Sequence, residues 1–172
     1  MRTFLLPVLF TACFIFESIF LELTPGKYLH HDNLFVPHLL MIALILLTIY
    51  GNRNYGIMYG FIFGLLFDVI YIEIIGIYMV VFPIVCYLIS KIMKVLQTNL
   101  IIVTFVTLIG VALLEVSVYY MSFLIHRTDM VFSTFLHDRL IPTIILNLVL
   151  TIIFAYPLKR HFEKLADQLR NE

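Results

Sequence analysis

The longest stretch without a basic residue places the strongest constraint on how this chain folds. No Lys or Arg occurs from Asn54 to Ser90, and most residues there are aliphatic, aromatic or glycine. A single helix of that length would extend about 55 Å, whereas the hydrocarbon core of a bilayer is about 30 Å thick. The segment must therefore fold back on itself. Its polar interior predicts that the reversal lies at Asp68–Gly76.

The composition indicates an integral membrane protein. Hydrophobic residues make up 62% of the 172 positions and charged residues 13%, and the mean hydropathy is +1.05. Soluble domains are roughly 45–50% apolar and about 25% charged. The formal net charge is zero and no block of basic residues occurs, which argues against nucleic acid as a partner.

Apolar runs of transmembrane length predict an all-α, compact bundle of six membrane-spanning helices. The first run is read as a retained helix, because Glu17 interrupts it and no signal-peptidase site follows. The last apolar run is followed by a charged tail that suits a short amphipathic helix. The expected spans are 4–23, 34–50, 56–71, 76–90, 100–125 and 140–156, within a membrane domain of residues 1–158 that precedes a cytoplasmic tail of residues 159–172.

The distribution of Lys and Arg predicts that both termini are cytoplasmic. With six spans, most of the 11 basic residues lie on the side of the termini: Arg2, Arg53, Lys91, Lys94, Lys159, Arg160, Lys164 and Arg170. Only Lys27, Arg127 and Arg139 lie on the other side. Cytoplasmic loops carry the excess of basic residues. This topology places Asp68 and Glu73 at the outer end of a helical hairpin.

A stripe of small residues on the third expected span ends in a carboxylate. Gly56, Gly60, Gly64 and Asp68 are spaced four apart, which puts them on one helix face. Small residues at this spacing allow close helix packing. The stripe is either a seam within the protein's own bundle or a docking site for a partner's transmembrane helix.

The acids of the expected turn have three alternative roles. Asp68 and Glu73 could cap the hairpin, contact an extracytoplasmic partner, or form a catalytic pair. Catalysis is disfavoured because the acids lie five apart across a turn and the GxGD sequence of intramembrane aspartyl proteases is absent. With Gly76, the turn and the stripe supply the candidate partner-binding residues Gly56, Gly60, Gly64, Asp68, Glu73 and Gly76.

Three further polar residues fall inside apolar runs: Glu17, Glu115 and Asn147. Ionisable residues at membrane depth usually face a bundle interior or a cavity. Glu17 lies in the outer half of the first span, where its side chain can reach the interface. Glu115 either hydrogen-bonds a tyrosine or Asn147, or contributes to a ligand pathway, an ion pathway or partner binding.

The sequence predicts neither a cofactor nor a metal. The histidines fall in loops, at helix ends or in the tail, and the adjacent pair His30 and His31 is a poor chelate without an HExxH motif. Cys13 and Cys86 lie in apolar runs and are expected to be small buried residues. No Ser-His-Asp set, P-loop or Rossmann glycine pattern occurs, so no enzyme is predicted.

The span layout and one signature together resemble a known family. The signature is the G-x-x-x-G-L-L-x-D of Gly60–Asp68, followed by E-I-I-G-I-Y. It resembles that of the MreD family of rod shape-determining proteins, with Gly60, Gly64, Asp68 and Gly76 at matching positions. Glu73 is less clearly part of the pattern. The resemblance implies a fold similar to the substrate-binding subunits of energy-coupling-factor transporters.

The resemblance also implies a function in cell elongation. The expected protein is a non-enzymatic, multi-pass scaffold of the bacterial cytoplasmic membrane that binds the bitopic protein MreC. This scaffold is expected to help link lateral cell-wall synthesis by RodA and a class B penicillin-binding protein to MreB. Membrane lipids are its other expected contacts. The alternative is a transporter subunit that holds a small molecule in a pocket near Glu115, although no docking surface for an energising partner stands out.

Overall fold

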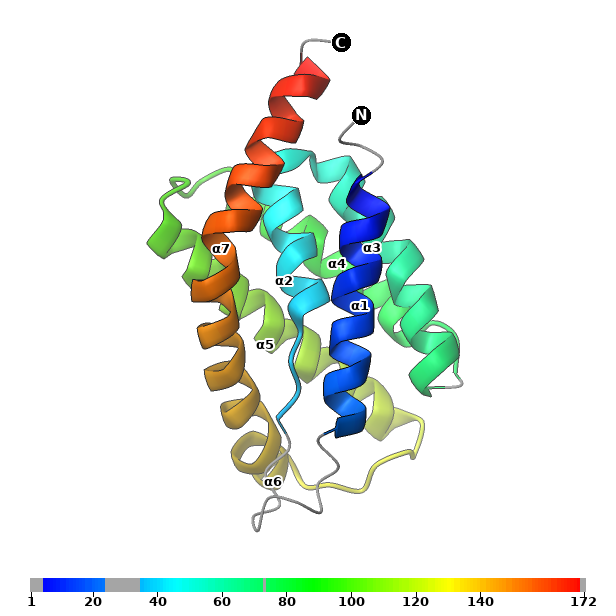
Figure 1. The fold of residues 1–172 in the computed structure, drawn as a ribbon. Helices are drawn as coiled ribbons and strands as arrows, with labels where there is room; N and C mark the ends of the chain where they lie inside the picture. The colour runs from blue at the N-terminus through cyan, green and yellow to red at the C-terminus, as the bar shows by residue number, and fades with distance from the viewer. Residues whose placement is uncertain (1–4, 24–34, 73, 171–172) are drawn as a thin grey trace.

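The computed structural model describes residues 5–23, 35–72 and 74–170, and this part of the chain is helical without any strand. Its helical segments form six rods (Figure 1). Three of the rods continue through a π-helical turn (η) from one element to the next. In chain order the elements are α1 (Leu5–Leu23), α2 (Leu39–Leu46) with η2 (Leu47–Gly51), α3 (Arg53–Phe67) with η3 (Asp68–Ile72), α4 (Ile77–Ile92), α5 (Leu100–Leu124), and α6 (Phe132–Phe135) with η4 (Leu136–Leu140) and α7 (Ile141–Arg170).

Four of these rods are long and apolar enough to cross a membrane: Leu5–Glu22, Arg53–Tyr71, Leu100–Leu124 and Phe132–Gln168. The segments Leu39–Gly51 and Ile77–Ile92 are apolar but shorter. The prediction of an all-α, polytopic membrane bundle is therefore confirmed. The exact limits of the six spans remain a prediction.

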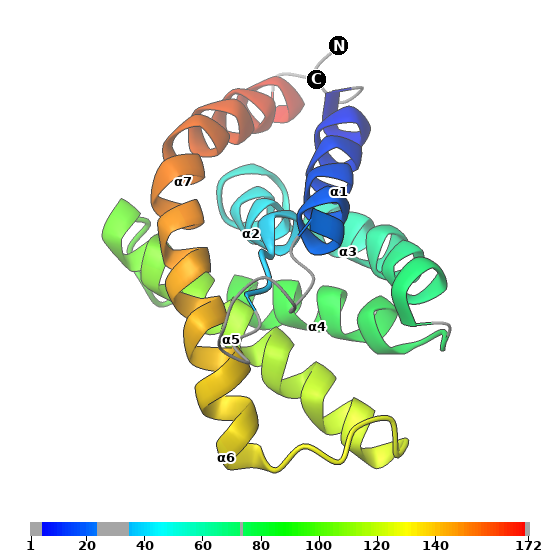
Figure 2. The ribbon, with the colours of Figure 1, turned by 60° about the horizontal axis from the view of Figure 1, so that its bottom comes forward.

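The short helix α2 forms the centre of the bundle. Every residue from Leu39 to Leu46 is buried, as expected for a helix that is apolar on all sides. Figure 2 shows α2 enclosed by α7, α1 and α3, with α4 and α5 beneath it. Aromatic side chains join α1 to α3 beside this core, and the ring of Phe14 meets that of Phe67 edge-on at 5.1 Å.

The helices α3 and α4 form the hairpin that the long stretch without Lys or Arg predicts. The chain reverses between Ile72 and Ile77, and Gly76 adopts a φ of +126° in the turn. That left-handed conformation favours glycine, which has no Cβ. Glu73 lies outside the described residues.

The last helix continues past the expected end of its span. α7 runs from Ile141 to Arg170 with Pro157 inside it, so the charged tail extends the same helix. The start of α1 and the end of α7 lie at one end of the bundle, and the α3–α4 turn and the α5–α6 connection lie at the other (Figure 1). We call these the terminal end and the turn end.

Candidate functional site

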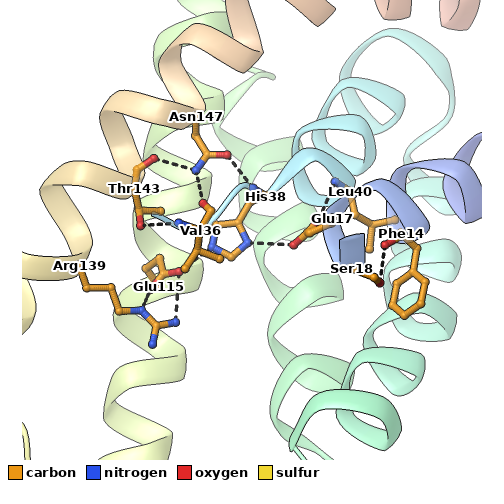
Figure 3. A network of polar contacts seen from close by, with 10 residues as sticks. All are labelled: Phe14, Glu17, Ser18, Val36, His38, Leu40, Glu115, Arg139, Thr143 and Asn147. Carbon is orange, nitrogen blue, oxygen red and sulfur yellow. Dashed lines mark hydrogen bonds and ion pairs between the residues drawn. The ribbon is translucent and has the colours of Figure 1, made fainter. Parts of the chain in front are cut away.

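An extended segment enters the bundle just before α2. Residues 35–38 have no helical conformation, so their backbone groups need partners, because lipid offers none. α7 provides them (Figure 3). Asn147 accepts a hydrogen bond from the His38 amide (2.7 Å) and donates to the Val36 carbonyl (2.8 Å). Thr143 Oγ1 accepts one from the Val36 amide (3.3 Å).

The carboxylate of Glu17 joins α1 to the start of α2. Its Oε2 accepts a hydrogen bond from the Leu40 amide at 3.2 Å, which satisfies one of the free N–H groups of the first turn. A negative charge is also favoured at a helix N-terminus. Oε1 of the same carboxylate lies 3.5 Å from His38 Nδ1. Glu17 thus replaces a local cap, since the His38 side chain makes no capping hydrogen bond.

Glu115 binds two basic side chains at once. His38 Nε2 lies 2.6 Å from Glu115 Oε1, and Arg139 Nε donates to Glu115 Oε2 at 2.8 Å. Glu17, His38 and Glu115 are each at most 2% exposed, whereas the Arg139 side chain is 30% exposed. Arg139 therefore connects the buried group to the surface of the bundle.

These contacts form one network, which we call the Glu–His–Glu–Arg network: Glu17, His38, Glu115 and Arg139. Its members come from α1, the segment before α2, α5 and η4. Buried charges are retained when they are paired and hydrogen-bonded, and here each carboxylate has a basic neighbour. The arrangement is suited to hold four elements in register. Among the described residues no group of three His, Cys, Asp or Glu could hold a metal ion.

Two cavities adjoin the network. One of about 230 Å³ is lined by Glu17, His38 and Arg139, and one of about 290 Å³ lies between the α5–α6 connection and α4. Tyr71, Tyr78 and Arg139 line both. Glu115 lines neither cavity, and its two oxygens contact His38 and Arg139.

Asp68 is fully buried in the α3–α4 hairpin. Its Oδ1 accepts a hydrogen bond from the Tyr78 amide at 2.8 Å. Its Oδ2 accepts from the amides of Gly76 and Met79 at 2.8 and 3.0 Å. The carboxylate therefore caps the N-terminus of α4 from the end of α3, which is one of the roles considered for it from the sequence.

The glycine stripe lies inside the protein's own bundle. A Cβ on Gly64 would come within 2.5 Å of the Tyr78 carbonyl oxygen, and a Cβ on Gly60 within 3.3 Å of the Pro83 nitrogen. Gly56 is buried against Thr48 of η2. Close approach of α3 to α4 thus depends on glycine, and α4 occupies the face that the stripe presents. Gly76 is partly exposed in the turn.

Two members of the network were not identified from the sequence. The sequence places His38 with the other histidines in loops, at helix ends or in the tail, and it identifies Arg139 only as a charge on the outer side. Asn147 and Glu115 are both buried, but Asn147 binds the extended segment and not Glu115. The sequence signal for His38 is its position directly before a wholly apolar helix, because a polar ring buried there needs polar partners from other helices.

Comparison with known proteins identifies the family. The sequence model of the family described as rod shape-determining protein MreD matches residues 2–165. The chain belongs to the MreD family. The rod shape-determining protein MreD of Bacillus subtilis (strain 168) is 40% identical over 172 residues, covering 100% of both chains. The chain is thus a rod shape-determining membrane protein of bacterial type. No solved structure matches it, and the likeness to energy-coupling-factor subunits stays a prediction.

Proposed function

We propose that this MreD-family protein is a non-enzymatic scaffold that binds the bitopic protein MreC at the α3–α4 hairpin. The observation that carries the proposal is the construction of this hairpin. It is fixed from inside by the glycine stripe and by Asp68, while its outer face remains apolar and uncovered. A fixed surface binds a partner helix with less loss of conformational freedom than a mobile one.

The outer face of the hairpin provides the proposed contact surface. Along α3 and η3, every third or fourth side chain is exposed and apolar, from Ile62 (43%) through Leu66 to Val69 (57%). Ile75 extends this surface into the turn and is 66% exposed. Lipid supplies no hydrophobic driving force between helices, so docking here rests on packing and on polar contacts near the turn.

The proposal gives the predicted partner-binding residues two different roles. Gly56, Gly60, Gly64 and Asp68 position the hairpin from within, whereas Gly76 in the turn and Glu73, which lies outside the described residues, are assigned to contacts with the extracytoplasmic part of MreC. The Glu–His–Glu–Arg network complements this role, because it fixes the remaining helices against which the hairpin packs.

The surrounding assembly is inferred from the family. We infer that both termini are cytoplasmic, with the turn end of the bundle outside, as the distribution of basic residues favours. In this orientation MreB lies on the side of the terminal end. RodA and the class B penicillin-binding protein act on the side of the hairpin turn. The scaffold thereby connects cell-wall synthesis to MreB.

Photo-crosslinking tests this function. The crosslinking amino acid is placed at Ile62 or Val69 on the hairpin, and at Ile145 on α7 as the matched control, since Ile145 is also exposed at 58%. The scaffold predicts adducts with MreC from the two hairpin positions and none from Ile145. Adducts from Ile145 alone would place the partner on α7 and refute the proposal.

A second function is favoured by the two cavities beside the network. Their volumes, about 230 and 290 Å³, each lie just below the range of about 300–1,000 Å³ that is typical of small-molecule sites. A transporter subunit would hold its ligand here, next to Arg139, Tyr71 and Tyr78. Native mass spectrometry of the protein released from mild detergent separates the two functions: a scaffold retains MreC, and a transporter subunit retains a small molecule.

A further inference from the structure

His38 lies between two buried carboxylates, one at each nitrogen of its ring (Figure 3). Nε2 is 2.6 Å from Glu115 Oε1, and Nδ1 is 3.5 Å from Glu17 Oε1. Nδ1 is buried and makes no hydrogen bond to the part of the chain that the structure describes. A neutral imidazole has one N–H and one acceptor nitrogen, whereas an imidazolium donates from both nitrogens. Two flanking carboxylates therefore match the imidazolium.

The charge balance of the network favours the same state. Arg139 pairs with Glu115 at 2.8 Å, and Glu17 accepts the Leu40 amide at the N-terminus of α2, where a negative charge is favoured. Two carboxylates and one guanidinium leave one negative charge over, which is costly at membrane depth. A second proton on His38 brings the network to zero charge.

The groups that face His38 add no further formal charge among the described residues. α7 presents the uncharged Asn147. The titratable and charged side chains around the ring and its cavity are Glu17 (α1), Tyr71 (η3), Tyr78 (α4), Glu115 (α5) and Arg139 (η4).

Two cavities lead from His38 to the turn end. The cavity of about 230 Å³ reaches Glu17 and His38, and it shares three lining side chains with the cavity of about 290 Å³. The second cavity extends to Arg127, which is exposed in the α5–α6 connection. Both are polar and larger than the roughly 30 Å³ of one water molecule. In the opposite direction every residue of Leu39–Leu46 is apolar and buried. Protons can therefore reach His38 from the turn end.

We propose that Glu17, His38 and Glu115 form a binding site for one proton, which is held on Nδ1 of His38 and exchanges with water at the turn end. On release the proton passes to water and the electron pair of the N–H bond stays on Nδ1. That pair then faces the Glu17 carboxylate, and the network keeps one negative charge without a partner. The junction of α1 with the start of α2 is thereby weakened as the pH at the turn end rises.

Nitrogen NMR of the histidine-labelled protein in lipid bilayers tests the charge state. The His38 signals are those lost in His38→Gln or, if this variant does not fold, those in contact with the Glu115 carboxylate carbon. At about pH 7.5, one unit above the midpoint of an ordinary imidazole, we expect two protonated ring nitrogens for His38. The exposed His137 should show one. A neutral His38 ring would overturn the proposal.

The isosteric variant Glu17→Gln tests why the proton is held. The Gln oxygen still accepts the Leu40 amide, and its NH2 group donates to a neutral Nδ1, so the variant needs no second proton on His38. The wild-type folded chain holds a proton that the unfolded chain releases above about pH 6.5. Its stability is therefore full below that pH and falls as the pH rises.

The ratio of folded to unfolded chain measures this dependence. It is obtained in non-ionic detergent by trapping the unfolded chain with streptavidin at two biotin tags. From about pH 7.5 to about pH 8.5 the wild-type ratio should fall about tenfold relative to that of Glu17→Gln. His137→Gln removes an exposed histidine and should follow the wild type. An equal pH dependence of Glu17→Gln and the wild type would refute the proton site.

Two substitutions on α5 test the route of exchange. Ser122 lines the turn-end cavity and Thr104 lines the α5–α7 groove, and both are half-buried. Ser122→Phe should slow magnetisation exchange between water and the His38 ring N–H groups several-fold, whereas Thr104→Phe should leave the rate unchanged. Equal rates in the two variants would overturn exchange through the turn-end cavities.

Discussion

Replacing Asp68 by Asn should destabilise the α3–α4 hairpin strongly. The carboxylate accepts three backbone hydrogen bonds, from the amides of Gly76, Tyr78 and Met79. An amide offers only one acceptor oxygen, so either one or two of these N–H groups face an NH2 group instead. A buried donor without an acceptor costs about 1–3 kcal/mol, and bonds to a neutral acceptor are weaker than bonds to a charged one. We therefore expect Asp68→Asn to lower the free energy of unfolding by about 3 kcal/mol.

Unfolding in mixed micelles with increasing sodium dodecyl sulfate measures this loss. Asp129→Asn is the matched control, because Asp129 is exposed in the α5–α6 connection and surface substitutions usually change stability by less than about 0.5 kcal/mol. Hydrogen exchange of the Tyr78 amide gives a local reading and should accelerate in Asp68→Asn alone. If Asp68→Asn changes stability no more than the control does, the capping role assigned to Asp68 is wrong.

Three other substitutions test the packing and the network by the same unfolding measurement. Arg139→Gln should cost about 2 kcal/mol, less than the 3–5 kcal/mol for breaking a fully buried pair, because the side chain is 30% exposed. A change below about 0.5 kcal/mol would mean that Arg139 does not stabilise the network. Asn147→Leu should cost about 2 kcal/mol by leaving backbone groups of residues 35–38 without partners; unchanged stability would mean that water or other groups replace it. Gly64→Ala should be more destabilising than Gly110→Ala. Each new Cβ would lie 2.5 Å from a neighbour, but the neighbour is α4 backbone at Gly64 and a flexible side-chain tip at Gly110. Equal losses would contradict the close α3–α4 seam.

The fold was largely predictable because membrane helices follow from length and composition. The apolar stretch without Lys or Arg is too long for one span and forces a reversal, and the structure places it between Ile72 and Ile77. The continuation of α7 through Pro157 was not expected, because proline usually ends a helix. The extended segment 35–38 was also missed, since apolar composition alone does not distinguish a helix from an extended chain whose partners lie in a distant element.

The polar site was only partly predictable. Acids such as Glu115 stand out in an apolar run, whereas the identity of their partners depends on how distant helices pack. His38 and Arg139 are 77 and 24 positions from Glu115 in the chain, and no local pattern connects residues at such separations. The glycine stripe is a similar case, because its spacing predicts a close helix contact without specifying the helix.

Retention of MreC by variants of two exposed faces tests the scaffold most directly. Ile62→Trp with Val69→Trp enlarges two exposed side chains on the hairpin, and Ile145→Trp with Val149→Trp enlarges two on α7, all between 43% and 58% exposed. Both pairs leave the buried core untouched. The scaffold predicts that affinity purification in mild detergent recovers MreC with the α7 pair and not with the hairpin pair. Recovery of MreC with the hairpin pair, or its loss with the α7 pair alone, would contradict docking on the α3–α4 hairpin.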